Sequence, residues 1–246
     1  MPIPVKSLII SWRTIGLSLL LSVVVGLTSV GEPVDRVIEA SIGRVAWRPV
    51  SGETVVVGVD DKTLQALQDQ EFSVANHARL IRAIDAADAK RLFIDFSYYR
   101  RLTHPDYAKV VAAVHQLDDR VILAVPAAKT SGTDVKVSYW PSPAMGDRAR
   151  RACICWEYEL WQVWRVPLAV IADGRHLPTF AALLANRPLD PPGLFALDYS
   201  YDTSTVTEYS AIDVLNGRIG RKQLAGKDVI FAPTNASSSD QHFLPG

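Results

Sequence analysis

Runs of β-branched and aliphatic residues alternate with amphipathic segments along much of the chain, and this alternation constrains the fold more than any other feature. Such runs lie at 54–61, 91–96 and 121–126. Continuous apolar runs of this length are typical of strands that are buried on both faces of a parallel sheet. Between the runs, residues 76–89 and 105–117 carry apolar side chains at helical spacing. This order of strands and helices predicts a parallel α/β core.

The second half of the chain extends this pattern less regularly. Residues 127–176 predict an antiparallel excursion from the sheet. Helical spacing returns at 177–186 and 210–217, and buried-strand runs return at 194–200 and 227–234. Helices that connect parallel strands cover both faces of a sheet. The fold class that we predict is therefore α/β, a three-layer domain with a mostly parallel sheet and an antiparallel excursion.

An uncharged apolar stretch, IGLSLLLSVVVGLTSV, runs from Ile15 to Val30. With the apolar residues just before Arg13, it approaches the roughly 20 residues that cross the hydrocarbon core of a bilayer. Lys6 and Arg13 precede the stretch and acidic residues follow it, which places the N-terminus in the cytoplasm under the positive-inside rule. This interpretation divides the chain into a short cytoplasmic tail at 1–14, a transmembrane anchor helix at 15–31 and an extracytoplasmic domain at 32–246.

The same stretch is compatible with two other interpretations. A cleaved signal peptide also has a basic start and an apolar core, and a helix buried in a protein core is equally apolar. The anchor and the signal peptide both export the chain, which in a bacterial cell means export to the periplasm. Apolar residues at helical spacing between 34 and 45 further predict a helix that continues to about Trp47.

Composition and motifs exclude several classes of function. The 26 Lys and Arg residues balance the 26 Asp and Glu residues, so the formal net charge is zero and gives no support to nucleic-acid binding. The chain lacks the glycine-rich phosphate-binding motifs, the G-x-S-x-G nucleophile motif and the H-E-x-x-H zinc motif. We therefore expect no catalytic residues, no metal and no cofactor. Cys153 and Cys155 alternate along a predicted strand, and we expect two buried thiols rather than a strained bridge.

Carboxylates cluster at the predicted ends of the strands. Asp60 and Asp61 end the first strand, Asp95 lies near the end of the second, Asp198 near the end of the fourth, and Asp240 follows the fifth. The carboxyl ends of parallel strands share one edge, where open α/β folds bind ligands. We predict that Asp60, Asp61, Asp95 and Asp240 converge there as a binding site for a ligand or cation. The alternative is that they cap the N-termini of helices.

Several stretches, in order, resemble a known family. TVVVGVDDKTLQAL at 54–67, HARLIRAIDAADAKRLFIDF at 77–96 and LAGKDVIFAPTNASSSDQHFLPG at 224–246 are similar to the type-two CHASE domain, the cyclase- and histidine-kinase-associated sensory extracellular domain. Three segments depart from the family's pattern. QDQEFSVANHAR at 68–79 replaces a Trp-Pro-rich segment, SYYRRLTHPDY at 97–107 replaces an acidic loop, and EYELWQVW at 157–164 replaces an Asp-rich turn.

The resemblance implies the sensory input region of a bacterial receptor in the inner membrane, acting as a homodimer on a small-molecule or ionic signal. Such domains are normally followed by membrane helices and a cytoplasmic output, such as a cyclic-di-GMP cyclase or phosphodiesterase, an adenylate cyclase or a kinase. No residues of an output module occur in this chain, so the resemblance implies no enzyme activity here. The alternative is an exported soluble enzyme or solute-binding protein that is released by cleavage of a signal peptide.

Overall fold

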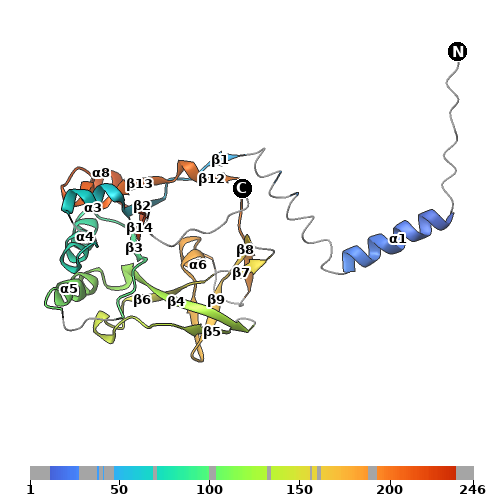
Figure 1. The fold of residues 1–246 in the computed structure, drawn as a ribbon, viewed down its shortest axis with the longest axis horizontal. Helices are drawn as coiled ribbons and strands as arrows, with labels where there is room; N and C mark the ends of the chain where they lie inside the picture. Colours follow the sequence, from blue (N-terminus) through green and yellow to red (C-terminus); the bar gives the residue numbers. More distant parts are fainter. Residues whose placement is uncertain are drawn as a thin grey trace, which may run out of the picture.

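The chain folds around one large mixed sheet that carries helices on both faces (Figure 1). The computed structural model describes residues 12–27, 38, 41, 47–68, 71–99, 104–131, 134–155, 157–159, 162–187 and 193–236.

Parallel strands form the half of the sheet on which the candidate site depends. In spatial order they are β6 (Arg150–Ile154), β4 (Val121–Ser131), β3 (Arg91–Ile94), β14 (Asp228–Pro233), β2 (Thr54–Val59) and β13 (Thr207–Ser210). The last of these strands along the chain, β14, therefore lies between the first two. The predicted strands at 54–61, 91–96, 121–126 and 227–234 are confirmed.

Side chains alternate between the two faces of these strands. Leu92 and Ile94 face the large apolar core, whereas Phe93 faces the other side, where its ring meets the ring of Phe180 edge-on at 5.5 Å. The helices that contribute to the large core are α3 (Asp61–Leu67), α4 (Val74–Ala86), α5 (Tyr107–Leu117), α7 (Ala211–Leu215) and α8 (Arg221–Leu224). The other face carries α6 (Phe180–Leu184).

The predicted antiparallel excursion is also confirmed. Beyond β6, strand β4 continues into a hairpin, and the sheet extends through β5 (Asp134–Val137), β9 (Ala169–Ala172) and β10 (Arg175–Pro178). A separate antiparallel sheet contains β7 (Glu157–Glu159), β8 (Gln162–Pro167) and β11 (Leu194–Ala196). Short elements complete the fold: β1 (Arg48–Pro49), paired with β12 (Tyr201–Asp202), and the 3-10 turns η2 (Asp118–Arg120), η3 (Pro143–Met145) and η4 (Thr203–Thr205).

One prediction for the second half of the chain is wrong, and the bounds of another change. The run at 194–200 is not a buried strand of the parallel sheet, because β11 covers only its first residues and pairs with β8 in the small sheet. The edge of the parallel sheet is β13 instead, whose sequence TEYS is too polar to read as a buried strand. The predicted helix at 177–186 shortens to α6, because its first residues belong to β10 and Thr179 caps the helix by accepting from the Ala182 N–H.

The N-terminal apolar stretch forms the helix α1 (Trp12–Leu27). Its large apolar side chains are exposed, with Leu17 at 68%. Among the residues that the structure describes, none of the helices has both the length and the apolar character needed to cross a membrane. Most of the predicted helix at 34–47 lies outside the described residues.

A buried ion pair holds the centre of the parallel sheet together. The Arg91 guanidinium at the start of β3 donates to both carboxylate oxygens of Asp228 at the start of β14, at 2.8 and 2.6 Å. A third donor of Arg91 reaches the Leu183 carbonyl of α6 at 2.8 Å. The two side chains are only 12% and 7% exposed, so neither charge is well hydrated. The pair ties two neighbouring strands to the helix that covers them.

This geometry predicts that Arg91→Ala lowers the free energy of unfolding by about 3 to 5 kcal/mol, because it leaves a buried carboxylate without its partner. Arg221→Ala is the matched control, since Arg221 pairs with Asp88 on the surface. Urea unfolding of the full chain, followed by tryptophan fluorescence, measures both variants. Equal stability of the two variants would contradict the assigned role of the ion pair.

Candidate functional site

Of the predicted carboxylates, the structure places Asp60, Asp61 and Asp95 at the carboxyl edge of the parallel sheet. Asp60 and Asp61 follow β2 directly, and Asp95 follows β3, with β14 between these two strands. Asp240 lies outside the described residues. Asp198 belongs elsewhere, because it pairs with Arg48 at 2.6 Å beside β1. Within the described part of the chain, no group of three or more His, Cys, Asp or Glu residues is arranged to hold a metal ion.

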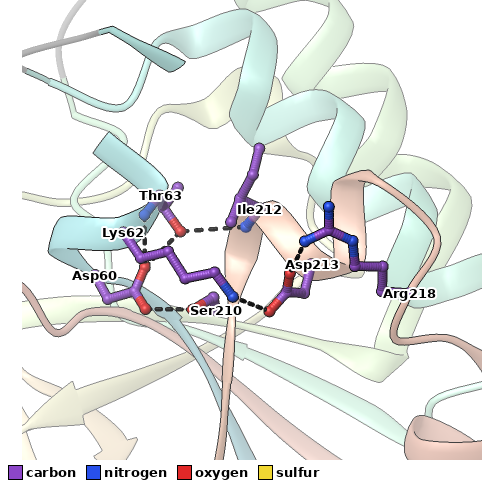
Figure 2. Close-up of polar contacts among 7 residues, drawn as sticks. All are labelled: Asp60, Lys62, Thr63, Ser210, Ile212, Asp213 and Arg218. Carbon is purple, nitrogen blue, oxygen red and sulfur yellow. Dashed lines mark hydrogen bonds and ion pairs between the residues drawn. The ribbon is translucent and has the colours of Figure 1, made fainter. Parts of the chain in front are cut away.

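Asp60 caps the helix that follows it, as Figure 2 shows. One carboxylate oxygen accepts from the Thr63 backbone N–H at 2.8 Å and from the Thr63 hydroxyl at 2.6 Å. The other oxygen accepts from the Ser210 hydroxyl at the end of β13. Burial raises the pKa of Asp60, but the hydrogen bonds from Ser210 and Thr63 outweigh it and hold the pKa below its usual value. Both oxygens are therefore engaged within the protein.

The same network continues to the start of α7. The Thr63 hydroxyl accepts from the Ile212 N–H at 3.2 Å. Asp213 lies 2.5 Å from the Lys62 ammonium and 2.9 Å from the Arg218 guanidinium, and its hydrogen bond with Lys62 is the main cause of its lowered pKa (Figure 2). The ends of β2 and β13 are thus joined to two helix N-termini.

Asp61 and Asp95 lie beside β14 and the residues that follow it. Asp61 accepts from the Ala236 N–H at 3.4 Å. Asp95 donates its backbone N–H to the Phe231 carbonyl at 2.8 Å, which continues the pairing of β3 with β14. The geometry thus assigns a capping role to Asp60, and ligand binding by these carboxylates stays a prediction.

A cavity of about 670 Å³ opens at the same edge of the sheet, beside the network. Val59 at the end of β2 and Pro233 at the end of β14 form part of its wall. Other wall residues carry rings, and these are Phe72, His77, Phe96, Tyr98, Tyr99 and Tyr107. Its volume lies within the roughly 300–1,000 Å³ of small-molecule sites, and its position is where parallel α/β sheets bind ligands. This cavity, which we call the aromatic pocket, is the candidate functional site.

His77 is enclosed by aromatic rings in the deep part of the aromatic pocket. It is 8% exposed and contacts the rings of Phe72, Phe96 and Phe231 at 4.6 to 5.2 Å between centroids. Its Nδ1 atom lies 2.8 Å from the Tyr98 hydroxyl. Burial lowers the pKa of His77 to about 4, and a hydrogen bond with the Phe72 backbone opposes this shift only in part. The ring is therefore neutral at physiological pH.

The residues that line the aromatic pocket range from buried to exposed. Tyr98 and Tyr107 are buried, and the Tyr107 hydroxyl donates to the Tyr98 carbonyl at 3.0 Å. Burial raises the pKa of both tyrosines, so both hydroxyls stay protonated. Glu71, Ser97 and Tyr99 are exposed and mark the open rim. Among the described wall residues, Glu71 is the group that carries a formal charge at neutral pH.

The sequence patterns do not predict the aromatic pocket. Much of its wall comes from the segments 68–79 and 97–107, which are two of the three that depart from the family's pattern. Aromatic residues directly after predicted strands were the available signal. The prediction for the cysteines is also wrong, because the structure joins Cys153 and Cys155 in a disulfide with the Cα atoms 5.3 Å apart.

Comparison with known protein families matches residues 18–246 to the family model described as the CHASE2 domain. No curated protein and no solved structure matches the chain. The matched range contains every element that forms the aromatic pocket and the network around Asp60.

The capping role predicts unequal effects for two adjacent carboxylates. Asp60→Ala should lower the free energy of unfolding by about 1–2 kcal/mol, because it removes the cap and its link to Ser210. Asp61→Ala should have a much smaller effect, since Asp61 makes one long hydrogen bond at the exposed end of the helix. Chemical denaturation of both variants measures the difference. An effect of Asp61→Ala as large as that of Asp60→Ala would contradict the assignment.

The buried position of His77 predicts a loss of stability in acid. Its folded-state pKa, about 4, lies below the 6.5 of an unperturbed His, so the unfolded chain takes up the proton first as the pH falls. The stabilisation is complete above about pH 6.5 and is lost between pH 6.5 and 4. From pH 7 to 4, the free energy of unfolding should fall by about 3 kcal/mol more in the parent than in His77→Gln.

The matched control for this experiment is His176→Gln, because His176 is exposed on β10. Its pH dependence should follow that of the parent. Denaturation curves at several pH values measure all three proteins. Parallel curves for the parent and His77→Gln would show that His77 is not held neutral by the fold.

Proposed function

Because the chain belongs to the CHASE2 domain family, whose members are sensory extracellular domains, we propose that it is the sensory input region of a bacterial signalling receptor. A helix at 15–31 anchors it in the inner membrane, residues 1–14 lie in the cytoplasm, and the domain at 32–246 lies in the periplasm. In the receptor, the domain controls a cytoplasmic output, such as a cyclic-di-GMP enzyme, an adenylate cyclase or a kinase.

The single observation that carries this proposal is the family match over residues 18–246. The properties of α1 support the membrane anchor. Apolar residues occur on all sides of this helix, and those such as Leu17, Leu19 and Leu21 are more than 60% exposed. A helix that is apolar all round is stable when a membrane or another apolar environment surrounds it. Water does not provide that environment.

A contiguous series of contacts joins the edge of the aromatic pocket to β1, where the chain enters the domain, and supports a route towards the anchor. The chain enters the domain at β1, where the Arg48 guanidinium pairs with Asp198 at 2.6 Å and lies 4.2 Å from the centroid of the Tyr201 ring. Strand β1 pairs with β12, which continues through η4 into β13. Ser210 at the end of β13 donates to Asp60, one residue after the pocket residue Val59.

In the proposed receptor, this route couples ligand binding to the arrangement of two copies in a homodimer. A ligand shifts the equilibrium between two states only as far as its affinities for them differ. The signal must therefore fit the aromatic pocket better in one state than in the other. The difference reaches the membrane through β13, β12 and β1.

The proposal predicts the topology of the chain in a bacterial cell. Alkaline phosphatase fused after Gly246 should be active, since this enzyme needs the disulfides that form outside the cytoplasm. The fusion should sediment with the inner membrane, and deletion of 12–27 should abolish the phosphatase activity. The control is a fluorescent protein fused before Met1, which should fluoresce because it stays in the cytoplasm. A soluble mature protein beginning near Glu32 would contradict the anchor and identify a signal peptide.

A further inference from the structure

We propose that the aromatic pocket binds an organic cation, namely an amine with an aromatic body. For its biological meaning as a signal, this inference rests on the proposed sensory function. The binding itself is a property of the pocket's charge and shape. Three features of the pocket carry the inference: the depth and size of the cavity, the rings that line it, and the charges of its wall.

The first feature is a deep end that suits an aromatic body. The Nδ1 atom of His77 pairs with the Tyr98 hydroxyl at 2.8 Å, and the Tyr107 hydroxyl donates to the Tyr98 carbonyl at 3.0 Å. The deep end therefore offers ring surfaces and aliphatic groups rather than unpaired donors or acceptors. An aromatic body fits such a surface without loss of its own hydrogen bonds, whereas a charged head group placed there would lose its hydration.

The second feature is the electrostatic character of the rings. Aromatic faces carry partial negative charge, and they attract an ammonium group within about 6 Å of the ring centre. Tyr99 supplies such a ring at the rim, where it stacks on Tyr139 with 3.8 Å between centroids and is held in place. An ammonium head group at the rim therefore meets both aromatic rings and water.

The third feature is the sign of the charge on the wall. His77 is neutral, and the described wall residues include Glu71 but no Lys or Arg. Lys62 lies on the neighbouring helix, but its ammonium is paired with Asp213 at 2.5 Å. A carboxylate or phosphate head group would meet the Glu71 carboxylate, and the described wall residues offer it no cation. The described wall thus favours a positive head group, with Glu71 at the rim as its counter-ion.

Three small probes with the same body test this inference. They are 2-phenylethylamine, 2-phenylethanol and 3-phenylpropionate, whose head groups are positive, neutral and negative at pH 7. Titration calorimetry is performed on the full chain in detergent. The amine should bind about tenfold more tightly than the alcohol, and the propionate more weakly than either. The inference would be overturned if the amine did not bind. It would also be overturned if the alcohol or the propionate bound as tightly as the amine, or more tightly.

Variants at the rim test the role of Glu71. Because this side chain is exposed, Glu71→Gln and Glu71→Lys should leave the fold intact. Glu71→Gln should weaken amine binding by about three- to fivefold and leave binding of the alcohol unchanged, as expected for a solvent-exposed charge pair. Glu71→Lys should reverse the preference towards the propionate. The matched control is Glu53→Gln at the opposite edge of the same sheet, which should bind all three probes like the parent.

If Glu71→Gln and Glu53→Gln changed the affinity for the amine equally, the assignment of Glu71 as the counter-ion would be overturned. These results are independent of the topology experiment. Amine selectivity in a chain whose phosphatase fusion is inactive would refute the receptor and keep the binding site. An exported, anchored chain that binds none of the probes would keep the receptor and refute the organic cation.

Discussion

The pairing of β14 with both β2 and β3 is the interaction on which the rest of the structure depends. Asp228 at the start of β14 lies beside both Thr54 and Arg91, so one strand sets the register of two others. The buried ion pair with Arg91 fixes that register at the amino end of the strands. At the carboxyl end, the same register brings Val59 and Pro233 to one level, where they form part of the pocket wall.

The carboxyl edge of the parallel sheet carries a polar network on one side and an aromatic cavity on the other. On the side of β13, hydroxyls, carboxylates and ammonium groups form a closed network in which Asp60 and Asp213 are fully engaged. On the side of β3, rings enclose a cavity in which the buried side chains of His77, Tyr98 and Tyr107 form hydrogen bonds within the protein. The network ties the ends of β2 and β13 to the helices that follow them, and the cavity leaves room for a ligand. Small-molecule sites are usually largely formed before the ligand binds, and a cavity beside such a network fits that arrangement.

Sequence patterns predicted the parts of the fold that depend on local periodicity. The strands at 54–59 and 91–94 are apolar at nearly every position because both of their faces are buried. The order of strands in space depends on contacts between distant residues. The place of β13 at the edge was therefore missed, and the run at 194–200 was assigned to the wrong sheet. The shared edge of Asp60 and Asp95 follows from parallel pairing alone. The aromatic pocket does not, because a ring after a strand looks the same in sequence whether it fills the core or lines a cavity.

The central position of β14 also governs when the domain can form. The partners of this strand are separated from it by most of the domain's sequence, and non-local pairing of this kind slows folding because a long loop must close first. Until residues 228–233 are available, β2 and β3 each present an unpaired apolar edge, which is the type of surface that pairs with other chains. A chain that is synthesised from its N-terminus therefore exposes two unpaired edges during most of its synthesis. The period of greatest risk of aggregation ends when β14 pairs with both strands.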